Sequence, residues 1–275
     1  MTLQEANKYG EELLQQAGIA DATIDAWYLL EYVTGINRAM YFLNMQKQLS
    51  EAELEQYQAY LEQRKNHIPL QHITGVQEFM GMNFAVNEHV LIPRQDTEVL
   101  VEEALKVLQP GMQVLDMCTG SGCIIISLSK MGKIEGTGVD ISVEALDVAK
   151  KNNANLDAGV TWIQSDLFEN VEERYDMIVS NPPYIRTAVI EELKEEVKFH
   201  DPYIALDGKE DGLYFYRKIV EESTKYLKEN GMLYFEIGHD QGQEVKNLME
   251  EAGFSEVLIK KDLAGLDRVV FGRYN

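Results

Sequence analysis

The stretch MQVLDMCTGSGCIIISLSKM, residues 112–131, decides the fold of this chain. Residues 112–117 are typical of a buried strand and residues 123–131 of a helix, and the turn between them contains Gly120 and Gly122. Glycine allows the backbone to turn tightly and to come close to a ligand. Such a turn lies over the carboxyl end of a sheet and beside a helix N-terminus, where open α/β sheets bind their ligands.

The same alternation of strand and helix continues toward the C-terminus. Strands are predicted at 135–140, 160–165, 175–180 and 232–238, and helices at 98–108, 143–155, 212–228 and 242–253. The last two predicted strands, 256–261 and 268–274, have no helix between them. The alternation predicts a Rossmann-like α/β fold with a mostly parallel, doubly wound sheet. The final pair should add an antiparallel edge, and Thr97 should cap the helix at 98–108.

The first part of the chain is predicted to be helical. Helices are expected at 3–18, 22–35 and 51–65, the last opened by a capping box at Ser50, and Pro69 should close this region. Strands at 82–86 and 89–92 flank Asn87 and Glu88 and predict a hairpin. We therefore expect a small helical domain at 1–74, a hairpin linker at 75–93 and a catalytic domain at 94–275.

Composition limits the class of protein. The chain has 275 residues, a formal net charge of −21, two cysteines and five scattered histidines. No Cys/His spacing resembles a zinc site, so no metal is expected. Proteins that bind duplex nucleic acid usually present a basic face, so the acidic balance makes direct nucleic-acid binding an unfavoured prediction. No apolar run approaches the ~18–20 residues of a membrane helix, and the acidic N-terminus is unlike a signal peptide. We expect a cytoplasmic protein.

Acidic residues near the glycine turn indicate which cofactor it binds. Asp140 ends the strand at 135–140, where it could accept hydrogen bonds from both hydroxyls of a ribose. The dinucleotide fingerprint requires a third glycine three positions after Gly122, where this chain has Ile125. A carboxylate at Asp116 would repel a pyrophosphate but could bind, through water, an ammonium group. S-adenosylmethionine carries an ammonium group and no phosphate, and is the cofactor we expect.

Two further segments complete the predicted site. Asp166 and the backbone of Leu167 follow the strand at 160–165, where an adenine ring would lie. The corner Asn181-Pro182-Pro183-Tyr184 follows the strand at 175–180. In the common methyltransferase strand order it faces the glycine turn across the crevice of the sheet.

The corner has the groups needed to hold a planar –NH2 group. The residue before a proline is forced into extended geometry, and proline itself offers no donor. The side-chain oxygen of Asn181 and the carbonyl of Pro182 can each accept one hydrogen from the amine, while Tyr184 can stack on its plane. An adenine amine and a glutamine amide both fit this description.

Motifs along nearly the whole chain resemble the release-factor glutamine methyltransferases (the HemK/PrmC family). They are PLQHITG at 69–75, VLIPRQDTE at 90–98, VLDMCTGSGCI at 114–124, SDLF at 165–168, IVSNPPYI at 178–185, DPYIAL at 201–206, FEIGHDQG at 235–242 and DLAGLDRVVFGR at 262–273. The resemblance implies transfer of a methyl group from S-adenosylmethionine, leaving S-adenosylhomocysteine, to the glutamine side-chain amide of the Gly-Gly-Gln motif in release factors. It also implies a small helical N-terminal domain joined by a hairpin to the catalytic domain, and we expect the helical domain to recognise the substrate.

The resemblance implies residue roles as well. Residues 181–184 would bind the target glutamine. The cofactor site would be lined by Cys118, Thr119, Gly120, Ser121, Gly122, Asp140 and Leu167. Arg94 and Thr97 would lie near the methionine end of the cofactor.

The chain departs from the family pattern at three positions. Cys118 and Lys209 stand where the family usually has glycine, and Asp201 where it usually has Glu. Cofactor binding should survive Cys118 unless its φ is positive. The alternatives are a nucleic-acid amino methyltransferase, acting on adenine N6 or guanine N2, and an adaptor that binds a nucleotide without turnover. A monomer is the simplest expectation.

Overall fold

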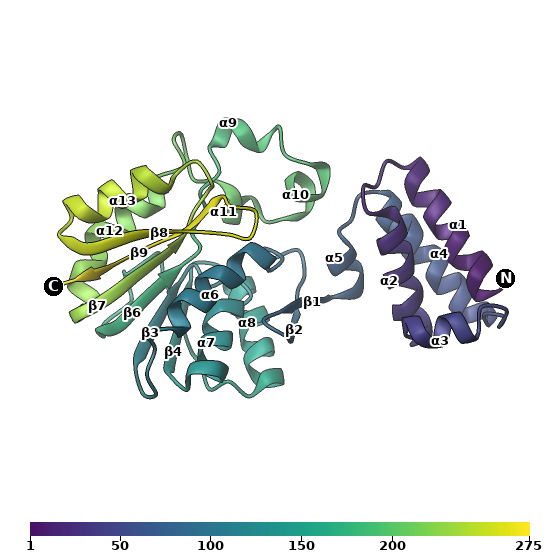
Figure 1. The fold of residues 1–275 in the computed structure, drawn as a ribbon, viewed down its shortest axis with the longest axis horizontal. Coiled ribbons are helices and arrows are strands. Elements are labelled where there is room, and N and C mark those ends of the chain that lie inside the picture. Colours follow the sequence, from purple (N-terminus) through teal and green to yellow (C-terminus); the bar gives the residue numbers. More distant parts are fainter. The chain divides into compact units, whose positions relative to one another are not determined.

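The computed structural model describes residues 1–275, and the chain divides into two compact units (Figure 1). The helical unit comprises residues 1–76 together with 194–200, and the catalytic unit comprises 77–193 together with 201–275. The short segment 194–200 therefore belongs to the helical unit although it lies deep in the sequence of the other. No helix combines the length and apolar character that a membrane span needs.

The helical unit contains six helices. They are α1 (Leu3–Gln16), α2 (Ala22–Thr34), α3 (Arg38–Leu43), α4 (Glu51–Lys65), α5 (Leu70–Thr74) and α10 (Glu195–His200). Capping boxes at Thr2 and Ser50 start α1 and α4. The prediction that Pro69 closes the helical region is wrong, because Pro69 occupies the N-cap of α5. Proline is tolerated at a helix start because the backbone N–H that it lacks would be unpaired there.

A buried arginine attaches α10 to the rest of the helical unit. The Arg64 side chain is 4% exposed, and its Nε donates to Asp25 over 2.7 Å. A second guanidinium nitrogen donates to Glu196 in α10. Burial raises the pKa of Asp25, although the Arg64 guanidinium opposes the shift. These contacts link positions 132 residues apart, which sequence periodicity could not predict.

The hairpin lies earlier in the sequence than expected. Strands β1 (Val76–Phe79) and β2 (Met82–Ala85) are joined at Met80 and Gly81, with φ of 50° and 71°. Tight hairpin turns favour positive φ at both central residues, which Gly81 adopts without strain. Residues 89–92 form no strand; Val90 and Ile92 are instead buried as core residues. The predicted pairing around Asn87 and Glu88 is therefore wrong.

The catalytic unit is built on a seven-stranded sheet, as predicted. Its strands are β3 (Gln113–Met117), β4 (Glu135–Asp140), β5 (Thr161–Gln164), β6 (Tyr175–Ser180), β7 (Leu227–Glu236), β8 (Phe254–Lys261) and β9 (Asp267–Tyr274). Their order is β5-β4-β3-β6-β7-β9-β8. The five strands from β5 to β7 are parallel, and β9 pairs antiparallel with both β7 and β8. The strand order reverses between β3 and β6, where ligands bind in such sheets.

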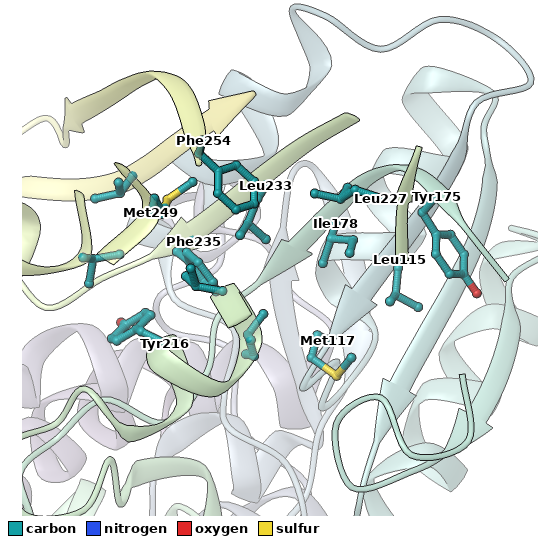
Figure 2. Close-up of a cluster of buried hydrophobic side chains, with 14 of the residues drawn as sticks. Leu115, Met117, Tyr175, Ile178, Tyr216, Leu227, Leu233, Phe235, Met249 and Phe254 are labelled. Carbon is teal, nitrogen blue, oxygen red and sulfur yellow. The ribbon is translucent and has the colours of Figure 1, made fainter. Parts of the chain in front are cut away.

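Helices cover both faces of the sheet (Figure 1). One face carries α6 (Glu98–Leu105), α7 (Cys123–Gly132) and α8 (Val143–Leu156), and the other carries α12 (Tyr214–Tyr226) and α13 (Gly242–Glu251). Alternate strand residues enter the two cores: Leu115 and Ile178 pack with α12 and α13, whereas Val114 and Val179 pack with α6 and α7. Figure 2 shows the first cluster, in which Tyr216 and Met249 lie near Phe235. Each such side chain stabilises the fold by roughly 1.5–3 kcal/mol on burial.

Short elements connect these layers. They are the 3-10 helix η1 (Gln95–Thr97) and the helices α9 (Thr187–Ile190) and α11 (Tyr203–Leu206). Thr97 stands at the N-cap of α6, as expected, but makes no side-chain capping bond. Its φ of −67° and ψ of −22° are already helical, whereas a capping residue needs extended geometry. The predicted capping role of Thr97 is therefore wrong.

Candidate active site

A cavity of about 330 Å³ opens at the carboxyl ends of β3, β4 and β6, wholly within the catalytic unit. Of the predicted site residues, those that line it are Arg94, Thr97, Cys118, Thr119, Gly120, Ser121, Asp140, Asp166, Leu167, Asn181 and Pro183. The structure thus brings the glycine turn and the start of the proline corner into one cavity. Its volume lies in the range of small-molecule sites.

The glycine turn wraps around the carboxylate of Asp140. The backbone N–H of Gly120 donates to Asp140 Oδ2 over 2.8 Å, and that of Ser142 donates to Oδ1 over 3.0 Å. The backbone N–H of Ile141 also interacts with this carboxylate, and the lone pairs that these donors leave free are available to a ligand. Burial raises the pKa of Asp140, while these backbone donors oppose the shift.

Gly122 is required where the turn enters α7. Its φ is 79°, and a Cβ there would lie 2.8 Å from the Trp162 ring. The close approach lets α7 start directly against β4 and β5. A side chain at Gly122 would therefore displace the start of α7 and the loop that precedes it. Gly122 does not line the cavity itself, and its predicted role is reduced to shaping the turn.

Cys118 has a φ of 63°, in the left-handed region that favours glycine. The condition under which Cys118 was expected to be tolerated is therefore not met, and the loop holds a strained residue. The side chain packs against the buried cluster of the α12 face. Burial raises the pKa of its thiol, so the sulfur is held as a neutral apolar group.

Asp116 lies beneath the turn and does not line the cavity. It is fully buried, and its Oδ2 accepts a hydrogen bond from the Thr119 hydroxyl. Burial raises the pKa of Asp116 to about 7, and its Oδ1 has no hydrogen-bond partner. The structure therefore gives Asp116 a demonstrable contact with the loop and none with the cavity.

The proline corner is held rigidly from behind. Gln241 is 4% exposed, and its side-chain nitrogen donates to the carbonyls of Tyr184 (3.1 Å) and Gly212 (3.2 Å). Gly208 and Gly212 allow this packing, since a Cβ at Gly208 would lie 2.7 Å from the Tyr184 backbone and one at Gly212 would lie 2.4 Å from the Tyr184 carbonyl. Both Gly208 and Gly212 are thus needed by the corner, and the φ of 75° at Gly212 favours glycine in its own loop as well.

The four residues of the corner are not equally placed. Asn181 and Pro183 line the cavity, whereas Pro182 and Tyr184 do not. The Tyr184 ring packs against the buried cluster of the α12 face. Burial raises the pKa of its hydroxyl. A stacking position on a ligand plane is therefore not visible for Tyr184 in this arrangement.

An ion pair connects two of the family motifs over the cavity. Arg94 Nη2 lies 2.7 Å from Asp201 Oδ2, and the Asp201 side chain is 1% exposed. Burial raises the pKa of Asp201, and the Arg94 charge opposes that shift. Arg94 is half exposed and lines the cavity, so its position depends on a carboxylate that the solvent does not reach.

Sequence reasoning missed the cavity lining at His89, Val90, Leu91 and Pro93, which it placed in the hairpin linker, and it missed one whole wall. This wall is made by residues of the segment 202–215, namely Pro202, Ile204, Ala205, Lys209, Tyr214 and Phe215. The motif DPYIAL and the glycines at 208 and 212 were the available signals. Lys209, in place of the usual glycine, has a φ of 70°.

The residues present fit S-adenosylmethionine. The cavity presents the carboxylates of Asp140 and Asp166 beside apolar groups such as Met117 and Phe215. Carboxylates favour a cationic ligand with ribose hydroxyls and would repel a pyrophosphate. No group of three or more His, Cys, Asp or Glu side chains is arranged to hold a metal ion.

Comparison with known proteins gives matches along the whole chain. Residues 5–75 match the family model described as PrmC N-terminal domain, and residues 95–197 match the Methyltransferase small domain. The release factor glutamine methyltransferase of Geobacter sulfurreducens is 39% identical over 99% of this chain and 96% of its own length. That of Clostridium acetobutylicum is 41% identical over 96% and 97%, respectively. A solved methyltransferase from Pyrococcus furiosus has a TM-score of 0.54 at 16% identity, covering 78% of this chain and 96% of that one, which supports the fold alone.

Proposed function

The chain belongs to the release factor glutamine methyltransferase family, and from this membership we propose how its own residues carry out the reaction. The enzyme uses S-adenosylmethionine to methylate a glutamine of peptide-chain release factors. We assign the methyl group to the side-chain amide nitrogen (N5) of the glutamine in a Gly-Gly-Gln motif. S-adenosylhomocysteine is the second product.

One observation carries the assignment of the site: Asp140 and Asn181 line the same cavity from the two sides of the strand reversal. The side of Asp140 suits the cofactor, and the side of Asn181 suits the substrate amide. Methyl transfer needs the two reactants to be in contact and aligned, and holding them together can supply roughly 7–11 kcal/mol of the barrier.

The cofactor side is assigned residue by residue. Asp140 accepts hydrogen bonds from the ribose hydroxyls, while Asp166 and the backbone of Leu167 border the adenine ring. Arg94 and Thr97 lie toward the methionine end. Gly120 brings the backbone close to the ligand, and Cys118, Thr119 and Ser121 complete the wall. Asp116 orders the turn through Thr119.

The substrate side activates a poor nucleophile. An amide nitrogen is a weak nucleophile because its lone pair is delocalised into the carbonyl, as in the peptide bond. Asn181 Oδ1, on the cavity wall, accepts one of its hydrogens, which returns electron density to nitrogen and orients it. The carbonyl of Pro182 is our proposed acceptor for the second hydrogen, although Pro182 does not line the cavity in this arrangement. The bound cofactor supplies a methyl group on a positively charged sulfur. The proton leaves nitrogen after alkylation, when it has become acidic, so no general base is needed beforehand.

Tyr184 has a narrower role than stacking. Its ring packs on the buried cluster and its carbonyl is held by Gln241. Tyr184 therefore supports the corner from the core side, with Pro183 filling the space between it and the cavity.

The remaining organisation is proposed from the sequence. The sequence predicts a substrate-recognition domain at 1–74, a linker at 75–93 and a catalytic domain at 94–275. We propose these roles for the two units, with residues 77–93 in the catalytic unit and 194–200 in the helical unit. The enzyme acts as a monomer in the cytoplasm and binds no nucleic acid directly. The net charge of −21 supports the last point.

Transfer of a labelled methyl group tests the function. The substrates are a release factor, the same factor with its Gly-Gly-Gln glutamine replaced by Glu, and ribosomal RNA or DNA. Label in the unsubstituted factor alone is expected. Label in the nucleic acid would instead support the amino methyltransferase alternative, and cofactor binding without any transfer would support the adaptor.

Asn181→Ala tests the substrate role of the corner. Transfer should be abolished, while the Kd of S-adenosylmethionine by calorimetry changes less than about threefold, because the amide acceptor is lost and the cofactor wall is retained. Asn247→Ala is the matched control, since Asn247 lies exposed on α13. Turnover of Asn181→Ala comparable to this control would contradict the assignment.

A further inference from the structure

Glu236 is a buried acid that lies beside the proline corner. It is the last residue of β7, and Phe235 before it pairs in parallel register with Ser180, which precedes Asn181. Asn181 and Glu236 therefore leave neighbouring strands at the same level of the sheet. Glu236 is 2% exposed and does not line the cavity.

The contacts of Glu236 point to Asn181. The side chains of Asn181 and Thr97 face its carboxyl group, and both favour its ionised form. Its Oε2 has no hydrogen-bond partner. The Thr97 hydroxyl does not cap α6 and instead faces the Glu236 carboxyl group.

An ion pair does not account for Glu236. The Arg268 guanidinium lies near it, but donates to Asp262 over 3.0 and 3.2 Å and to the carbonyl of Ile237 over 3.3 Å. Arg268 also pairs with Asp96 over 3.2 Å. The charged or titratable groups that face Glu236 are Arg268 from β9, Asp96 from η1, the hydroxyls of Tyr184 and Tyr216, and the Cys123 thiol. Of these, only Arg268 favours the ionised form.

The hydrogen-bonding chemistry of the two side chains fixes their relative orientation. An ionised carboxylate can only accept, whereas an Asn carboxamide has a donor nitrogen and an acceptor oxygen. Asn181 must therefore turn Nδ2 toward Glu236, which leaves Oδ1 on the opposite side. Without this restraint the amide can rotate by about 180° about χ2 and present its own –NH2 group, since that torsion is roughly two-fold.

We propose that Glu236 is a positioning residue for methyl transfer: its carboxylate holds Asn181 Nδ2 and so directs Asn181 Oδ1 to the substrate amide. This inference rests on the proposed role of Asn181. Glu236 acts through Asn181 and not on the reactants, because it does not reach the cavity.

Glu236→Gln tests this role against a matched control, Glu229→Gln, which changes an exposed glutamate of the same strand. Glutamine keeps the shape but can both donate and accept, so the Asn181 amide loses its fixed orientation. We expect kcat with a release factor to fall at least about tenfold. A misplaced group can lower the rate by as much as roughly a hundredfold. The Kd of S-adenosylmethionine should change less than about threefold, since the cofactor wall is intact.

The pH profile supplies a readout that a structural role would not move. Wild-type kcat should fall as Glu236 becomes protonated, because a protonated carboxyl can donate to Asn181 Oδ1 and hold the amide reversed. This acid limb should be absent in Glu236→Gln and present in Glu229→Gln. Glu236→Asp keeps the charge but withdraws the carboxylate by one methylene, so it should lower kcat and retain cofactor binding even if the Gln variant folds poorly.

The outcomes separate the two proposals. Wild-type kcat and an unchanged acid limb in Glu236→Gln, or wild-type kcat in Glu236→Asp, would overturn the positioning role. Absence of transfer by the wild-type enzyme to any release factor would instead overturn the proposed function.

Discussion

Replacement of Cys118 should show how much strain the glycine turn stores. A residue with a Cβ pays ~1–2 kcal/mol in the left-handed region, and Cys118 has a φ of 63°. Cys118→Gly relieves this cost, but loses about 1 kcal/mol of side-chain burial and a further ~0.5–1 kcal/mol because glycine is freer in the unfolded chain. The terms nearly cancel, so the free energy of unfolding should stay within about 1 kcal/mol of wild type.

Alanine and valine make the prediction discriminating. Cys118→Ala loses the sulfur contacts and keeps the strain, so it should be less stable than Cys118→Gly by ~0.5–1 kcal/mol, the usual advantage of glycine at such a φ. Cys118→Val should be the least stable, because a β-branched side chain is a steric outlier at positive φ. The expected order of stability is Gly close to Cys, then Ala, then Val.

The assay must report the catalytic unit alone. The chain has two tryptophans, Trp27 in the helical unit and Trp162 beside Gly122 in the catalytic unit. In a Trp27→Phe background, Trp162 fluorescence therefore follows unfolding of the catalytic unit. A difference of 1 kcal/mol corresponds to about 2–4 °C in Tm for a domain of this size. Cys118→Ala matching or exceeding Cys118→Gly would refute the strain at this position.

Other perturbations test the supports of the site. Lys209 is exposed and has a φ of 70°. Lys209→Gly should therefore be more stable than Lys209→Ala by ~0.5–1 kcal/mol in thermal unfolding. Equal stability of the two variants would contradict a backbone cost at this φ. Asn152→Leu removes three hydrogen bonds, to the N–H and the carbonyl of Ala85 and to the Ser121 carbonyl. The free energy of unfolding in urea should fall by about 2–4 kcal/mol. A fall of less than about 1 kcal/mol would contradict this structural role. Gln241→Leu leaves the carbonyls of Tyr184 and Gly212 without this donor and should lower kcat about tenfold, with the Kd of the cofactor unchanged. An unaltered kcat would show that these two hydrogen bonds are not needed for activity.

Most of the catalytic sheet could be predicted because its central strands are short segments buried on both faces, and they alternate along the chain with helical segments. The predicted strands at 135–140 and 175–180 coincide with β4 and β6, and the last two strands, β8 and β9, pair antiparallel as expected. The hairpin was misplaced because the apolar residues at 89–92 resemble a strand while Val90 and Ile92 fill the core without pairing. Periodicity reports burial and not the hydrogen-bonded partner.

Much of the cavity could be predicted because two of its parts are each formed by a few consecutive residues. The turn at Gly120 and the corner at Asn181 are local structures whose residue types carry their chemistry. The wall formed by 202–215 has a weaker signal, because the packing that requires Gly208 and Gly212 is with Tyr184, which is distant in sequence. The same holds for Glu236, whose carboxyl group is faced by Thr97 and Asn181 from other elements.

The fold keeps two carboxyl groups where apolar side chains would be more stable. Burial raises the pKa of Asp116 from 3.8 to about 7 and that of Glu236 from 4.5 to about 7. A group with a raised pKa binds its proton more tightly in the folded state, so its contribution to stability is complete below the unfolded pKa and is lost as pH rises to 7. At about 1.4 kcal/mol per pKa unit, ionising Glu236 costs the folded state about 3 kcal/mol above pH 7. Orientation of Asn181 requires that same ionised form. Activity should therefore rise with pH over the range in which stability falls. Glu236→Gln should flatten the activity curve and remove about 3 kcal/mol of the fall in stability, while the part due to Asp116 remains.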